Sequence, residues 1–64
     1  MSETDCYRTQ EGTIFRVCKD KEGRLSVELL DSSAWRSAPI GMAGLRIAPG
    51  TRRLSDRQVD ALPE

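Results

Sequence analysis

The stretch TIFRVCKDKEGRLSVELLD, residues 13–31, decides the fold of this chain. Two runs within it, residues 13–20 and 24–31, carry apolar residues at every second position, which is the period of a β-strand. The residues KEG between the runs suit a type I turn followed by Gly23 in the left-handed conformation. The pattern therefore predicts a β-hairpin over residues 13–30.

The length of the loop sets the register of this hairpin, with Asp20 opposite Arg24. Counting outward predicts one face on which Lys19 lies opposite Leu25, Val17 opposite Val27 and Phe15 opposite Leu29. The other face then pairs Cys18 with Ser26, Arg16 with Glu28 and Ile14 with Leu30. Opposite charges stabilise a cross-strand pair, and a slip of one residue would send every apolar side chain to the wrong face.

Two other segments carry weaker strand signals. Residues 6–9 are expected to form a third strand that pairs with residues 13–18, because a short turn separates the two. A fourth strand is expected at residues 44–48, where Leu and Ile alternate before the Pro-Gly turn. The segment between the hairpin and this strand suggests one helical turn that carries Trp35 and stops at Pro39.

The end of the chain predicts a short helix over residues 56–62. Ser55 is a favourable N-cap, and Gln58 three residues later completes a capping box. A helix of this length is not stable alone in water, so Val59 and Leu62 are expected to dock on the sheet.

These elements predict an α+β fold that is mainly β. A small three- to four-stranded antiparallel sheet has the hairpin 13–30 at its centre, and the helix 56–62 packs on it. A chain of 64 residues allows a single small domain, 1–64, in which we expect residues 1–4 to be disordered. Such a chain buries only about 60% of its unfolded surface, so the second face of the sheet is expected to stay uncovered.

The composition is that of an ordinary soluble domain. Ten basic and ten acidic residues give a net charge of zero, which argues against a wholly basic nucleic-acid coat and against an acidic mimic of DNA. The chain has no apolar run long enough to span a membrane, and its polar N-terminus is unlike a signal peptide. We therefore expect a cytoplasmic protein without a membrane partner.

Catalytic and metal sites are disfavoured by what the sequence lacks. The chain has no histidine, the commonest general base, and none of the phosphate-loop, dinucleotide-binding or nucleophile-elbow motifs. Cys6 and Cys18 are expected to be reduced thiols in the cytoplasm, and two cysteines without histidine do not make a usual zinc site. The expectation is that the protein is not an enzyme and holds no metal or cofactor.

A protein contact is the first functional hypothesis. Trp35, Arg36 and Met42 lie in a loop-rich segment and belong to the residue types enriched at protein interfaces. Arg52 and Arg53 would add polar anchors. This favours a non-enzymatic binding or regulatory protein that occludes a site on a partner. In size and in its lack of catalytic groups, the chain is similar to small proteins that phages and mobile elements encode to inhibit a host machine.

Two alternatives stay open. Five arginines and one acid lie between residues 36 and 57, and guanidinium groups bind phosphates in a bidentate manner, so the segment could bind nucleic acid. Those candidates are Arg36, Arg46, Arg52, Arg53 and Arg57. They could equally be solvated residues that balance the acidic first half. A second alternative is a structural subunit that functions as a homo-oligomer, such as a homodimer, because Ile14 and Leu30 would lie on the uncovered sheet face.

Overall fold

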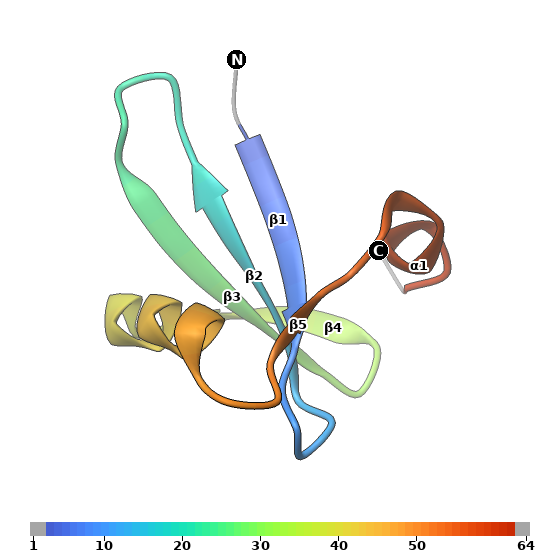
Figure 1. Cartoon of the computed structure of the whole chain (residues 1–64). Coiled ribbons are helices and arrows are strands. Elements are labelled where there is room, and N and C mark those ends of the chain that lie inside the picture. The colour runs from blue at the N-terminus through green and yellow to red at the C-terminus, as the bar shows by residue number, and fades with distance from the viewer. Residues whose placement is uncertain (1–2, 63–64) are drawn as a thin grey trace.

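The structure, a computed structural model, describes residues 3–62 and contains a five-stranded antiparallel sheet (Figure 1). The order of the strands across the sheet is β4-β3-β2-β1-β5. The elements are β1 (Glu3–Arg8), β2 (Ile14–Lys19), β3 (Leu25–Asp31), β4 (Ala34–Ala38), the 3-10 helix η1 (Ile40–Ile47), β5 (Arg52–Arg53) and α1 (Asp56–Asp60). The predicted mainly β class is correct, but the predicted count of three to four strands is one or two too low.

The central hairpin, β2 with β3, has the predicted register. Phe15 lies opposite Leu29, Arg16 opposite Glu28 and Val17 opposite Val27. Gly23 has the expected positive φ of 85°, and its N–H donates to the carbonyl oxygen of Asp20 at 3.0 Å. The period-two pattern and the turn chemistry are both local, which is why they identify this element from sequence.

Strand β1 confirms the predicted third strand and extends it toward the N-terminus. It pairs with the whole of β2, which places Tyr7 opposite Phe15 with their ring centroids 5.4 Å apart in a stacked arrangement. The sequence predicts disorder for residues 1–4. Glu3 and Thr4 form the start of β1, whereas residues 1–2 lie outside the described part of the chain.

The segment after the hairpin differs from the prediction in two places. The expected helical turn around Trp35 is strand β4, because Ser32 adopts a φ of 59° in a tight turn that sends the chain back along β3. The expected strand at residues 44–48 belongs instead to the helix η1. Pro39 precedes this helix, and its carbonyl oxygen accepts from the N–H of Met42 at 3.0 Å, so the proline begins a helix here.

The C-terminal segment contains a strand that the sequence pattern does not reveal. Strand β5 has two residues, Arg52–Arg53, and pairs with the end of β1. The capping box of α1 is present, with the Ser55 hydroxyl accepting from the N–H of Gln58 at 3.3 Å. The helix covers Asp56–Asp60, shorter than the predicted 56–62, because the chain tightens after Asp60 into bonds between residues three apart.

The hydrophobic core lies between one face of the sheet and η1. Phe15, Val17 and Val27 come from β2 and β3, and Ala43 of η1 packs on them. Met42, Tyr7, Leu29 and Ala38 are the half-buried residues around this cluster. The helix α1 lies on the opposite side of the sheet in Figure 1 and buries none of its residues fully. The molecule therefore has one well-covered face, the η1 face, and one thinly covered face, the α1 face.

Candidate functional site

The helix η1 carries three exposed aliphatic side chains. The exposed fractions are 55% for Ile40, 36% for Leu45 and 91% for Ile47. We call these three residues the η1 ridge. A helix that covers a core usually points its large apolar residues inward, so three exposed ones on a single short helix mark an unusual surface.

The geometry of the 3-10 helix explains the exposure of Ile47. Residues three apart share a face in such a helix, so Gly41, Gly44 and Ile47 form one row. The core takes Met42 and Ala43 from the other rows, which turns the glycine row toward solvent. Apart from the neighbouring residues and the backbone of η1 itself, no atom lies within 4 Å of a Cβ built on Gly41 or Gly44. A side chain would therefore fit at either position, and internal packing does not require glycine there.

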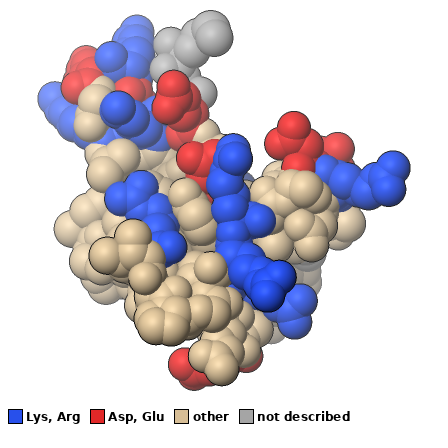
Figure 2. Space-filling model, in the orientation of Figure 1, with Lys and Arg blue, Asp and Glu red and all other residues tan. Residues whose placement is uncertain are grey.

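Two arginines lie on or next to η1 in the chain, Arg46 within the helix and Arg53 on strand β5. Arg46 is exposed, and its Nε donates to the carbonyl oxygen of Ala43 at 2.8 Å. Arg53 is held by Asp5, with Nη2 2.8 Å from the carboxylate oxygen Oδ1, and this hydrogen bond raises the pKa of Arg53. Figure 2 shows basic side chains across the middle of the visible face at the position of β5, next to a largely uncharged area over η1.

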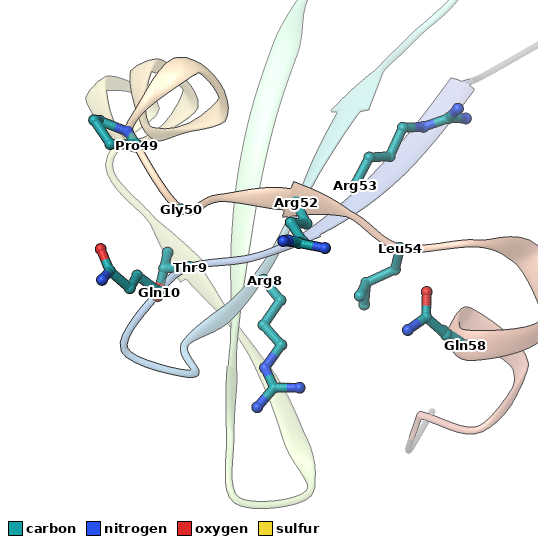
Figure 3. A pocket seen from close by; sticks show the side chains of 9 residues that line it. All are labelled: Arg8, Thr9, Gln10, Pro49, Gly50, Arg52, Arg53, Leu54 and Gln58. Atoms are coloured by element: carbon teal, nitrogen blue, oxygen red, sulfur yellow. The ribbon is translucent and has the colours of Figure 1, made fainter.

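A second candidate site is an open pocket of about 810 Å³ at the end of the sheet. Figure 3 shows Arg8 and Arg52 on one side of β5 and Arg53 pointing to the other side. Arg8 lies directly opposite Arg52 in the pairing of β1 with β5. Within residues 3–62, neither of these two arginines forms an ion pair with an acid. We call this site the Arg8–Arg52 pocket.

The wall of this pocket depends on a close approach between two turns. Gly50 has a φ of 83°, and a Cβ built on it would lie 2.7 Å from the Cβ of Gln10. Only glycine tolerates both this backbone conformation and this contact. The turn at residues 49–50 is thereby held against the turn that follows β1.

The structure separates the residues predicted to form a protein contact. Arg52 and Arg53 are neighbours on β5. Met42 lies on η1, and its side chain packs inward against the core. Trp35 lies on the α1 face, half-buried, with the guanidinium carbon of Arg16 4.1 Å from its ring centroid. Arg36, its neighbour on β4, pairs with Asp31 through an Nε–Oδ2 distance of 2.9 Å.

The five arginines of the nucleic-acid hypothesis are also dispersed. Only Arg52 and Arg53 lie in the Arg8–Arg52 pocket. Arg36 lies on β4 at the opposite edge of the sheet, Arg46 lies on η1 and Arg57 lies on α1. The sequence reasoning missed Arg8 because its partner strand is too short to show a pattern.

The thiols and carboxylates of the described chain form no metal-binding cluster. No three Cys, Asp or Glu side chains of residues 3–62 come close enough together to hold a metal ion. Cys6 is buried, and this burial raises the pKa of its thiol, while the charge of Arg16 opposes the shift. Cys18 lies 4.0 Å from a carboxylate oxygen of Glu28.

Comparison with known proteins adds no family. No protein-family model, no curated protein and no solved structure is similar enough to this chain to count as a match. Among the described residues, no helix has both the length and the apolar character needed to cross a membrane.

Proposed function

We propose that this protein is a non-enzymatic binding and regulatory protein that uses the η1 ridge to occlude a site on a partner protein. The observation that carries the proposal is the 91% exposure of Ile47 at the end of η1, on the same helix as the exposed residues Ile40 and Leu45. Several exposed large apolar side chains on one short helix of a small protein are typical of an interaction site.

The energetics of the η1 ridge are favourable for association. Full burial of an exposed isoleucine side chain contributes about 1.5–3 kcal/mol. Ile47, which is 91% exposed, can contribute most of that, and the partly buried Ile40 and Leu45 add smaller amounts. A few central residues usually dominate the affinity of a complex, with polar contacts around them. Arg46, beside the ridge, is suited to this peripheral role.

The two outward glycines support a close contact with a partner. A glycine within a helix destabilises it by roughly 0.5–1 kcal/mol relative to alanine. Gly41 and Gly44 are not required by the internal packing, and neither has a positive φ. Their lack of side chains lets a partner surface approach the helix backbone beside Ile47.

The partner surface that fits this site is an apolar recess with an acidic edge. The recess would receive Ile47 and Ile40, and the acidic groups would face Arg46. Binding of this kind needs no chemistry from the chain itself. It acts by covering a functional surface of the partner, which is the simplest mode for a small regulatory protein.

The test compares two matched variants in nuclease-treated lysate of the organism that encodes the chain. Ile47→Asp places a charge at the most exposed residue of the ridge, and Ser33→Asp places the same charge in the exposed β3–β4 turn. The partner retained by the wild-type protein is identified, purified and titrated with each variant. We expect Ile47→Asp to weaken binding by about 30-fold or more, equal to about 2 kcal/mol, and Ser33→Asp to bind like the wild type. Equal affinities for the two variants would exclude the ridge as the contact.

A further inference from the structure

We propose that the Arg8–Arg52 pocket is a separate binding site for the phosphodiester backbone of single-stranded nucleic acid. This inference goes beyond the proposed function, because it concerns a different ligand and different residues. The first observation is the direct opposition of two arginines on neighbouring strands. Like charges placed directly opposite each other destabilise a sheet, and a bound anion would remove that cost.

The backbone pairing brings these two arginines close together. The N–H of Leu54 donates to the carbonyl oxygen of Cys6 at 2.9 Å, which makes these residues a hydrogen-bonded pair of the β1–β5 ladder. Such pairs alternate along antiparallel strands, so Arg8 and Arg52 form the next one, with Cα atoms about 5.5 Å apart. Their guanidinium groups therefore start from adjacent points on the same face of the sheet.

The charge of this pair is not neutralised within the described chain. Four other arginines each lie within ion-pair distance of a carboxylate, namely Arg16, Arg24, Arg36 and Arg53. Arg8 and Arg52 have no such neighbour among residues 3–62, although they face each other. Guanidinium groups bind phosphate oxygens through two parallel hydrogen bonds, so the pair is well suited to a phosphate group.

The other polar side chains of the pocket favour a nucleotide over a carboxylate-bearing peptide. Gln10 and Gln58 stand at opposite ends of the pocket, with Arg8 and Arg52 between them (Figure 3). An amide group both donates and accepts hydrogen bonds, as sugar hydroxyls and base edges require, whereas an acidic peptide side chain needs donors alone. The Oε1 atom of Gln58 already accepts from the N–H of Ser55, so Gln58 presents mainly its amide nitrogen as a donor, and Gln10 is the amide whose oxygen and nitrogen both face a ligand.

The size of the pocket favours a nucleotide over an inorganic ion. Its volume of about 810 Å³ lies within the roughly 300–1,000 Å³ typical of ligand sites and is much larger than one phosphate group needs. The pocket is a recess between the turn at residues 49–50 and α1, where an unpaired nucleotide can enter. Base-paired strands keep their bases stacked inside the duplex, so we infer a single-stranded ligand.

The experiment is a fluorescence anisotropy titration of a 5′-labelled 12-nucleotide oligouridylate at several salt concentrations between 50 and 200 mM. The test variant is Arg8→Gln with Arg52→Gln. The matched control is Lys21→Gln with Arg24→Gln, which removes the same charge from the β2–β3 turn. We expect at least a tenfold loss of affinity in the test variant alone. The slope of log K against log salt should also fall by about 1.4, because about 0.7 is lost per phosphate contact.

Three results would overturn this inference. The first is an equal loss in the control variant, which would mean that net charge alone drives the binding. The second is a wild-type affinity for a 12-residue polyglutamate that equals the affinity for the oligonucleotide, which would make the ligand an acidic peptide. The third is an unchanged affinity in the test variant, with its folding verified by circular dichroism. The variant Ile47→Asp should bind the oligonucleotide normally, which separates this site from the η1 ridge.

Discussion

Arg16 lies between Trp35 and Glu28 on the thinly covered α1 face of the sheet. Its guanidinium carbon is 4.1 Å from the centroid of the Trp35 ring, and its Nη2 atom is 2.7 Å from a carboxylate oxygen of Glu28. A cation over an aromatic ring and an ion pair across the strands hold the same side chain. The single tryptophan therefore ties β4 to β2 and β3 on this face.

We predict that Trp35→Ala destabilises the fold by about 2 kcal/mol, because the mutation removes both the ring and the cover over Arg16. The neighbouring substitution Arg36→Ala is the control, since the ion pair of Arg36 with Asp31 is exposed and contributes less than about 1 kcal/mol. Urea denaturation followed by circular dichroism measures both changes. Two variants of equal stability would mean that Trp35 does not stabilise the sheet.

The opposition of Arg8 and Arg52 leads to a prediction on stability. Arg52→Glu replaces a repulsive cross-strand pair with an attractive one and should stabilise the fold by about 0.5–1 kcal/mol. Arg52→Gln, which removes the repulsion alone, should fall between the wild type and Arg52→Glu. Thermal denaturation at low salt measures the series. A less stable Arg52→Glu protein would show that the two arginines do not repel each other in the fold.

Gly50→Ala should destabilise the protein by about 2 kcal/mol. The left-handed backbone costs an alanine roughly 1–2 kcal/mol, and the added Cβ must displace Gln10, whose own Cβ would lie 2.7 Å away. In a domain of this size the melting temperature should fall by roughly 10 °C. Gly44→Ala serves as the comparison, since open space surrounds that position, and it should melt at or above the wild-type temperature. The same melting temperature for both variants would contradict the assigned turn.

The buried thiol of Cys6 predicts a loss of stability at alkaline pH. Burial raises the pKa of this thiol, so as the pH rises the unfolded chain loses the proton before the folded chain does. The contribution of Cys6 is complete below the ordinary thiol pKa of about 8.5 and declines as the pH rises above it. Urea titrations at pH 7.5 and pH 10 should show a larger decline for the wild type than for Cys6→Ala. An identical decline in both proteins would show that Cys6 ionises equally in the two states.

The sequence predicts the elements whose signals are local. The alternation in residues 13–31 with Gly23 at the turn identifies the central hairpin and its register. The Ser55–Gln58 capping box identifies the start of α1 for the same reason. Strand β5 carries no pattern of its own, because two residues are too few to show a period. It forms only because β1, from the other end of the chain, offers an edge to pair with.

The two candidate sites were hard to predict for related reasons. Leu45 and Ile47 alternate in the sequence like strand residues. In the structure they belong to the 3-10 helix η1, and because Met42 and Ala43 of this helix pack on the core, Ile47 points outward. Arg8 becomes a site residue through a pairing between segments far apart in the sequence. Arg52 and Arg53 were identified from their charge, but their side chains point to different sides of β5 (Figure 3).

A homodimer formed through the η1 ridge, and not through Ile14 and Leu30 on the sheet face, makes a prediction that differs from the proposed function. If the η1 ridge binds a second copy of the chain, sedimentation equilibrium will give twice the 7.1 kDa mass, and Ile47→Asp will restore the monomer. The proposed function predicts a monomer for the wild type and for Ile47→Asp at the same concentrations. A wild-type dimer that Ile47→Asp dissociates would reassign the ridge to self-association.

The most direct test of the central claim is photocrosslinking from the η1 ridge inside the cell that encodes the protein. Benzoylphenylalanine is placed at position 47 in one strain and at position 33, in the exposed β3–β4 turn, in another. The proposal predicts that position 47 alone crosslinks to one protein, and that the crosslinked residues of this partner map to one apolar patch with an acidic edge. A partner that crosslinks equally from both positions, or from position 33 alone, would contradict the proposal that the η1 ridge is the contact surface.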